Sequence, residues 1–383
     1  MTVYIDDFNS DLGWSKVGSW VDSTYSISGG INTFTAGAGG ADTSAWTRTG
    51  FEGLNASITV SITNIASTPQ IHLRESSSGN YLKVYLDYAT STINIGKVVS
   101  GTYTSLGSVA CGINNAGTYT FTAKVFGNCL YGAILSAAAP FNVFKQLIYI
   151  GSDVSAFTGK SHGIGLTAST QKYNWIDMRT LDSLTNVVCV GDSNVGGDNP
   201  AYWPNQMMKR RFNEGFISVN QGTAGYSTQD IYNERATRIA PYFVSGADNI
   251  VSIATGNNDY AVESKTAAQA YAVQQTLMTY CKSLGYRVEL ATLIPFPYTQ
   301  GARPTTSLVF VDSLNTLIRA NPSVDGFTLC DIHTAFGATN GQLGTSPSGL
   351  TNSDEIHYST ATGHLLAAKT HLLTLARNDR KSV

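Results

Sequence analysis

The hydrophobic periodicity of the chain changes near residue 184, and this change constrains the fold more than any other feature. Before it, apolar and polar residues alternate in short runs bounded by Gly, Asn and Ser, at 57–63, 81–88, 92–98, 119–125 and 145–150. Such alternation is typical of half-buried antiparallel strands, and many short strands in series favour a sandwich. We therefore expect an all-β domain over residues 1–182, with no helical period.

The second half has a different rhythm, in which apolar runs alternate with helical stretches. The expected strands lie at 186–190, 216–219, 249–254, 287–293 and 327–332, and the expected helices at 203–212, at 264–284 and from about 360 onward. Alternating β and α elements predict a parallel sheet between helices, here a domain over residues 185–383. In that architecture ligands bind at the carboxyl ends of the strands.

Composition excludes several classes of protein. Only 13% of the 383 residues are charged, and 24 Lys and Arg face 26 Asp and Glu. This balance argues against a nucleic-acid binder or a protein of anionic membranes, which both need excess basic residues. A hydrophobic content of 42% argues against disorder.

Short sequence signals narrow the class further. No apolar run reaches the length of a membrane helix, and the first residues have no secretory h-region. The five cysteines are widely spaced and never form CxxC, so we expect buried thiols rather than a disulfide framework or a zinc site.

Four polar segments follow expected strands or precede an expected helix, at 191–194, 219–227, 254–259 and 354–357. The first places Ser193 between a strand and a helix. A serine hydroxyl becomes a strong nucleophile when a base takes its proton and an acid orients that base. Asp354 and His357, three residues apart, could supply these two groups. The Ser193 N–H, the Gly225 N–H and the Asn258 side-chain amide are candidate donors to an oxyanion, each typically worth ~2.7–4 kcal/mol.

These segments resemble the blocks of the SGNH (GDSL-type) hydrolase family over about residues 185–380. The matching blocks are Gly191-Asp192-Ser193, residues 220–225, Gly256-Asn257-Asn258-Asp259 and Asp354 through His357. The resemblance implies a flavodoxin-like α/β/α fold with Ser193 as nucleophile, His357 as base and Asp354 as its orienting acid. It also implies an oxyanion hole of Ser193, Gly225 and Asn258, and no cofactor or metal. Asn194 stands where the family has Leu, and we expect this departure to affect substrate contacts more than catalysis.

Several neighbouring residues compete for these roles. Gly222 is a rival for the oxyanion glycine, and His333 is a rival base or a residue lining the pocket. We expect His364 and His371 to pack within a helix or lie at its surface. Asp192 should hold the serine turn rather than act as the triad acid, and Asn257 and Asp259 should stabilise their loop. A GxSxG match at 159–163 lies in the all-β half, so we interpret it as part of a hairpin.

The first half resembles a concanavalin/laminin-G-like jelly roll over about residues 1–180, a fold that binds glycans or serves as a spacer. Both halves together resemble carbohydrate acetyl-esterases and phage tail-spike deacetylases. We therefore expect a serine esterase that removes O-acetyl groups from a polysaccharide through an acyl-enzyme. A lipase or thioesterase, and a glycan-binding adhesin without activity, remain alternatives.

The expected partner is an acetylated polysaccharide or another acyl ester, and we expect neither nucleic acid nor membrane as a partner. The sequence is compatible with a homo-oligomer. We expect an extracellular or virion-associated (phage tail) location.

Overall fold

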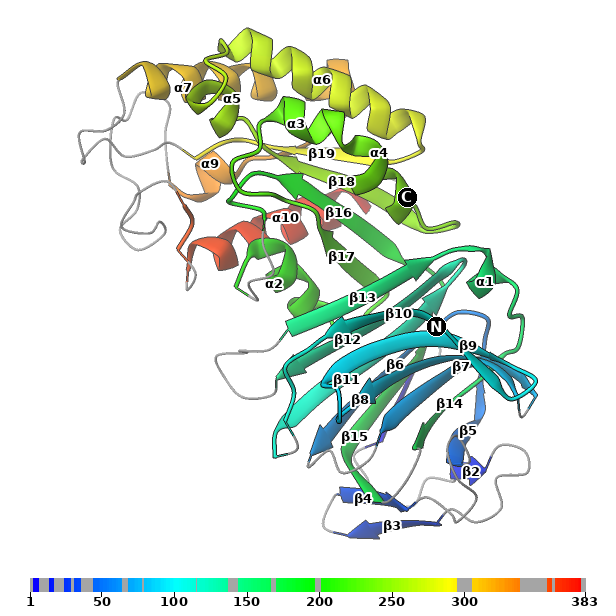
Figure 1. Ribbon diagram of the computed structural model, residues 1–383. Helices are drawn as coiled ribbons and strands as arrows, with labels where there is room; N and C mark the ends of the chain where they lie inside the picture. The colour runs from blue at the N-terminus through cyan, green and yellow to red at the C-terminus, as the bar shows by residue number, and fades with distance from the viewer. Residues whose placement is uncertain are drawn as a thin grey trace. The chain divides into compact units, whose positions relative to one another are not determined.

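Figure 1 shows a computed structural model of the protein. It describes residues 3–6, 14–16, 24–28, 31–35, 44–63, 68–77, 79–114, 116–136, 144–166, 170–196, 201–294, 305–337, 357–359 and 362–379. Contacts within the chain divide it into two compact units. Unit 1 comprises Met1–Leu184 with Phe212–Gly215 and Val244–Ala247, and unit 2 comprises Thr185–Arg211, Phe216–Phe243 and Asp248–Val383.

Unit 1 consists of two antiparallel sheets in its described segments. The eight-stranded sheet has the order β13 (Phe144–Ile150), β12 (Cys129–Ser136), β11 (Thr118–Phe126), β6 (Ala56–Thr63), β15 (Thr170–Thr180), β4 (Ile31–Thr35) and β3 (Thr24–Ser28), with β1 (Val3–Asp6) also paired to β15. The seven-stranded sheet has the order β10 (Thr102–Ala110), β9 (Thr92–Val99), β8 (Asn80–Asp87), β7 (Pro69–Ser77), β14 (Ser161–Leu166), β5 (Ser44–Glu52) and β2 (Trp14–Lys16). The β-rich first half is thus confirmed, and the jelly-roll connectivity stays a prediction.

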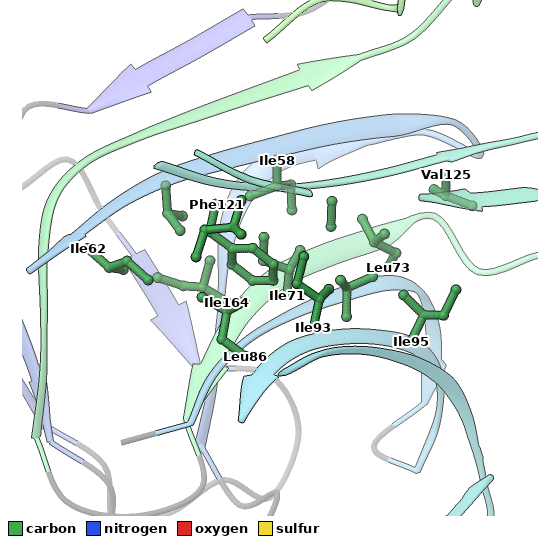
Figure 2. Packing of buried hydrophobic residues seen from close by; sticks show 14 of the residues in the cluster. Ile58, Ile62, Ile71, Leu73, Leu86, Ile93, Ile95, Phe121, Val125 and Ile164 are labelled. Atoms are coloured by element: carbon green, nitrogen blue, oxygen red, sulfur yellow. The ribbon is translucent and has the colours of Figure 1, made fainter. Parts of the chain in front are cut away.

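The core of unit 1 is formed by apolar side chains from alternating positions of these strands. Ile58 and Phe121 come from the eight-stranded sheet, and Ile71 and Ile164 from the seven-stranded one; each is at most 1% exposed. Figure 2 shows these side chains pointing toward one another. Such burial removes apolar surface from water and is the main stabilising contribution to the sandwich.

Two details of unit 1 bear on the sequence-based predictions. β6 is buried on both faces, not half-buried, and its hydroxyls find partners within the protein, as in the 2.8 Å contact between Thr59 Oγ1 and Thr122 Oγ1. Residues 161–163 of the GxSxG match begin strand β14, so this segment lacks the strand–turn–helix of a nucleophile elbow. The only helix found in the described part of unit 1 is the single turn α1 (Ser152–Ser155).

Unit 2 is built on a parallel sheet of five strands in its described residues. Their order is β17 (Phe216–Asn220), β16 (Thr185–Gly191), β18 (Asp248–Ala254), β19 (Arg287–Ala291) and β20 (Thr328–Cys330). In chain order this is 2-1-3-4-5, the order of flavodoxin-like sheets. The order reverses between β16 and β18, and the crevice at such a reversal is where open α/β sheets bind their ligands.

Helices cover both faces of this sheet (Figure 1). One face carries α3 (Thr228–Asn233), α5 (Asn257–Ala261), α6 (Ala267–Ser283) and α7 (Thr305–Ala320), and the other carries α2 (Trp203–Arg210) and α10 (Gly363–Asp379). The shorter helices are α4 (Arg235–Arg238), η1 (Ala240–Tyr242), α8 (Pro322–Asp325) and α9 (Ile332–Ala335). Val188 and Val190 of β16 share a core with Leu277 of α6 and Leu314 of α7.

The strands and helices expected in unit 2 are present, with most of their ends shifted by one to three residues, whereas helix α7 was not among those expected. The last strand ends at Cys330, not at residue 332, because the Asp331 side chain accepts a hydrogen bond from Thr334 N–H and caps helix α9. The five cysteines are buried free thiols, as expected. Among the described residues, no helix is both long enough and apolar enough to cross a bilayer.

Candidate active site

Ser193 lies on a tight turn at the carboxyl end of β16. The carbonyl of Asp192 accepts hydrogen bonds from Val195 N–H at 3.0 Å and from Gly196 N–H at 2.8 Å, which closes the turn. Gly191 has no room for a side chain, because a Cβ there would lie 2.2 Å from the Ala254 carbonyl oxygen on β18. The glycine therefore allows β16 and β18 to approach closely just before Ser193. Ser193 itself is half-buried.

The Ser193 hydroxyl contacts the predicted base directly. His357 Nε2 lies 2.8 Å from Ser193 Oγ, although the two residues are 164 positions apart. This is the distance of a short hydrogen bond and fits a nucleophile paired with its base. Asp354, the predicted acid, lies outside the described residues, so its role stays a prediction.

Asp192 is buried and serves the turn, as the sequence suggested. Its Oδ1 accepts a hydrogen bond from Asn194 N–H at 2.9 Å. Burial raises the pKa of Asp192 to about 6; the hydrogen bond from Asn194 and the nearby charge of His357 oppose this increase.

Asn194 does not have the substrate-facing role expected from its departure from Leu. The residue is only 4% exposed, and its Oδ1 accepts a hydrogen bond from Tyr358 N–H at 2.9 Å. This amide oxygen therefore points into the protein and holds the residue that follows the base. The sequence carried no sign of this contact, because the partner lies 164 residues away.

The oxyanion candidates differ in which donors remain available. Gly225 is an exposed residue with φ +83°, a left-handed conformation that favours glycine, and its N–H donates to no other residue in the described part of the chain. The N–H of Gly222, its rival, already donates to Asn220 Oδ1 at 3.1 Å. This difference favours Gly225. The Ser193 N–H likewise has no acceptor among the described residues.

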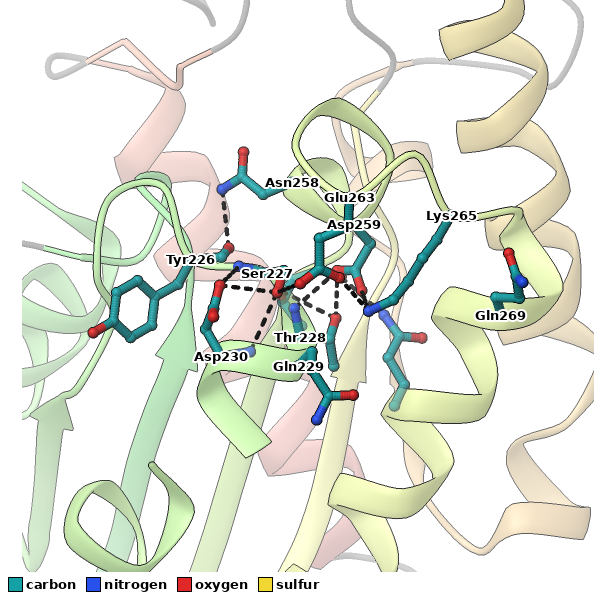
Figure 3. A network of polar contacts seen from close by, with 12 residues as sticks. Tyr226, Ser227, Thr228, Gln229, Asp230, Asn258, Asp259, Glu263, Lys265 and Gln269 are labelled. Carbon is teal, nitrogen blue, oxygen red and sulfur yellow. Dashed lines mark hydrogen bonds and ion pairs between the residues drawn. The ribbon is translucent and has the colours of Figure 1, made fainter. Parts of the chain in front are cut away.

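Asn258 is the second residue of helix α5, which follows β18, across the sheet reversal from Ser193. Its Nδ2 donates to the Tyr226 carbonyl at 2.9 Å (Figure 3). An amide NH2 has two donor hydrogens, so one can fix the side chain while the other remains for an oxyanion. The contact also joins the helix of Asn258 to the loop that holds Gly225.

A polar network supports these two elements (Figure 3). Asp259 is fully buried, and its Oδ2 accepts from Thr228 N–H at 2.9 Å and from Thr228 Oγ1 at 2.7 Å. Lys265 Nζ reaches Asp259 Oδ1 at 3.3 Å. Ser227 caps α3 and donates through Oγ to Glu263 Oε1 at 2.8 Å. Asp259 thus links α5 to α3, in agreement with the stabilising role expected for it.

The other three histidines of unit 2 are buried and have other contacts. The Nδ1 of His333 accepts from Arg319 at 3.1 Å. His364 packs against Tyr202 and Tyr358, and burial lowers its pKa to about 3. His371 stacks on Trp203 with ring centroids 3.8 Å apart. Packing within the protein is therefore the observed role of His364 and His371, and His357 is the histidine seen on Ser193.

Sequence reasoning missed a second buried polar cluster, beneath α10. Glu289, Cys330 and His371 bring one ligand atom each within 4.8 Å of one another, close enough to hold a metal ion. Glu289 Oε1, however, already accepts from Ser252 Oγ at 2.8 Å and pairs with His371 Nδ1. The second carboxylate oxygen, Glu289 Oε2, is buried and has no hydrogen-bond partner among the described residues. Glu289 between the apolar residues Val288 and Leu290 of β19 was the signal that could have revealed the cluster.

Comparison with known proteins gives structural likenesses only, since no family model and no curated protein matches the chain. A lipolytic protein of the G-D-S-L family from Veillonella parvula is 20% identical, covering 50% of this chain and 99% of its own, with a TM-score of 0.41. An acetyl-xylooligosaccharide esterase from Geobacillus stearmophilus is 18% identical, with coverages of 50% and 94% and a TM-score of 0.40. The carbohydrate-binding module CBM66 from Bacillus subtilis is 13% identical, with coverages of 42% and 91% and a TM-score of 0.33. At these values the likenesses do not assign the chain to a family.

Proposed function

We propose that this protein is a serine ester hydrolase of the SGNH type. The observation that carries the proposal is the 2.8 Å contact between Ser193 Oγ and His357 Nε2 at the carboxyl ends of the parallel strands. The order of the sequence blocks around Ser193, Gly225, Asn258 and His357 supports it. Asp354 is proposed as the acid that orients His357.

The reaction follows from these positions. His357 Nε2 takes the Ser193 proton while Oγ attacks the ester carbonyl. The oxyanion accepts hydrogen bonds from the N–H groups of Ser193 and Gly225 and from Asn258 Nδ2. When the C–O bond to the alcohol breaks, His357 returns the proton to the leaving oxygen and an acyl-Ser193 ester remains. Water, deprotonated by His357, then attacks this ester and releases the carboxylic acid and the free serine.

We infer that the substrate is an O-acetylated polysaccharide, so that acetate is the acid released. The support is the first half of the chain, whose charge-poor strands resemble those of glycan-binding jelly rolls. An extracellular or virion-associated location would suit such a substrate.

Release of p-nitrophenol from p-nitrophenyl acetate tests the esterase activity. We expect turnover by the unaltered protein and a loss of roughly 10⁶-fold in Ser193→Ala, the scale seen when a serine nucleophile is removed. Full activity in Ser193→Ala would exclude the proposed nucleophile.

Acyl-chain preference and acetate release test the substrate class. We expect acetyl esters to be preferred over octanoyl esters, and acetate to appear from at least one member of a panel of O-acetylated bacterial and plant polysaccharides. A strong preference for octanoyl esters would favour a lipase or thioesterase instead.

A further inference from the structure

Two contacts between consecutive residues join the serine turn to the segment that carries the base. Ser193 Oγ meets His357 Nε2 at 2.8 Å, and the next residue on each side forms the second contact, from Tyr358 N–H to Asn194 Oδ1 at 2.9 Å. Both sequence separations are 164. A rigid link one residue from a reactive pair restricts how far that pair can drift apart.

Both ends of the second contact are held firmly. On the serine side, Asn194 is buried, and its own N–H is tied to Asp192 Oδ1. On the histidine side, the Tyr358 ring packs against Phe336 at 5.1 Å and against His364 at 5.3 Å, measured between ring centroids. Ser359, which follows Tyr358, is tied to the start of α10, because its Oγ accepts a hydrogen bond from the N–H of Gly363, the first residue of that helix.

The chemistry of the position selects asparagine. Its Oδ1 is a short-reach acceptor without charge, whereas leucine of similar size offers no acceptor to Tyr358 N–H. Aspartate would keep the acceptor but add a second carboxylate beside the buried Asp192, at a cost in stability.

We propose that Asn194 is a positioning residue that sets the distance between Ser193 Oγ and His357 Nε2 through its hydrogen bond to Tyr358 N–H. This inference rests on the proposed esterase function. Asn194 touches neither reacting atom, so it acts on the rate only through the geometry of the pair.

Substitution by leucine and by aspartate separates positioning from general stability. Asn194→Leu should lower kcat for p-nitrophenyl acetate about 10²-fold, as misplacement of reacting groups by about 1 Å does, and leave KM within about twofold. Asn194→Asp should keep more activity than Asn194→Leu at pH 8, because it retains the acceptor, although its thermal unfolding midpoint should be the lower of the two. A merely structural role would make activity follow stability, with the aspartate variant the less active.

Asn186→Leu is a matched control at the opposite end of β16. Asn186 is buried and donates to the Tyr242 carbonyl at 2.7 Å and to Asn249 Oδ1 at 2.9 Å, so its loss removes comparable hydrogen bonds. We expect this variant to unfold at a lower temperature but to keep its kcat within about twofold, since a defect distant from the pair leaves its geometry intact.

The rate of Ser193 labelling by a fluorophosphonate gives a second readout that does not depend on the ester chosen. Slower labelling of Asn194→Leu than of the unaltered protein supports the positioning role. Equal labelling rates with equal kcat would overturn it and leave the esterase function standing. If the unaltered protein neither hydrolyses esters nor labels, the esterase function fails, and the positioning role fails with it.

Discussion

Three side chains have different roles in the proposed proton transfer, and single substitutions separate their contributions to the rate. Ser193→Ala and His357→Ala each remove a group that exchanges the proton, so both should lose most activity. Asp354→Ala removes only orientation and charge support, which water or a backbone carbonyl can partly replace. We expect a loss of roughly 10–1,000-fold, below the ~10⁴-fold seen when the acid of a Ser-His-Asp triad is altered. Steady-state kinetics of the three folded variants on p-nitrophenyl acetate measure these losses.

Two results would contradict this order. A folded Asp354→Ala protein as inactive as Ser193→Ala would show that nothing replaces the carboxylate. An active His357→Ala protein combined with an inactive, folded His333→Ala protein would show that His333 is the base and His357 is not. His333 is buried and accepts a hydrogen bond from Arg319.

At the scale of elements, the link between α3 and α5 supports the two proposed oxyanion donors outside the serine turn, Gly225 and Asn258. Asp259 is buried and accepts two hydrogen bonds from Thr228, whereas Lys265 is 19% exposed at its side chain and adds one longer contact to the same carboxylate. Asp259→Asn should lower the free energy of unfolding by about 1–3 kcal/mol, because an amide leaves part of this buried set unsatisfied. It should also lower kcat, since Gly225 and Asn258 then shift. Denaturant unfolding and ester hydrolysis provide the two measurements.

Lys265→Met is the matched comparison within the same network. The 3.3 Å contact of Lys265 is longer than both contacts of Thr228 with the same carboxylate, so this variant should lose less stability than Asp259→Asn and keep most of its kcat. A larger loss in Lys265→Met than in Asp259→Asn would contradict the assignment of the main stabilising contacts of Asp259 to Thr228.

For the whole molecule, stability depends on pH through a buried carboxyl in each unit. In unit 1, Glu75 is 4% exposed, and burial raises its pKa from 4.5 to about 7. The unfolded chain releases this proton first, so the free energy of unfolding falls as pH rises from about 4.5 to about 7 and stays low above that window. In unit 2, burial raises the pKa of Asp192 from 3.8 to about 6, so the free energy of unfolding also falls as pH rises through this range. Glu75→Gln should therefore raise the thermal unfolding midpoint at pH 8 and change it little at pH 4.5.

The exposed Glu52 of the same unit supplies the control, because Glu52→Gln removes an equal charge without relieving burial. Calorimetry at the two pH values compares the variants. Equal midpoints for Glu75→Gln and the unaltered protein at pH 8 would show that Glu75 carries no such penalty in the folded chain.

The pattern along the chain was enough to predict the two kinds of domain, many of their strands and the strand ends that carry Ser193 and Asn258. Strand periodicity, capping and the turn after β16 depend on residues a few positions apart, so they are readable along the chain. This is why β6, β9 and β11, the strand ends near Ser193 and Asn258, and the separation into β-rich and α/β halves followed from the pattern.

Only the tertiary structure decided which of these residues meet and in what environment. The Ser193–His357 distance and the inward turn of Asn194 depend on segments 164 residues apart, and the pairing of Glu289 with His371 on segments 82 apart. The burial that raises the pKa of Glu75 likewise exists only in the folded chain, where Glu75 pairs with Ser161 of β14. Hydrogen bonding and desolvation act through space at short range, so residues distant in sequence interact only after the chain has packed them together.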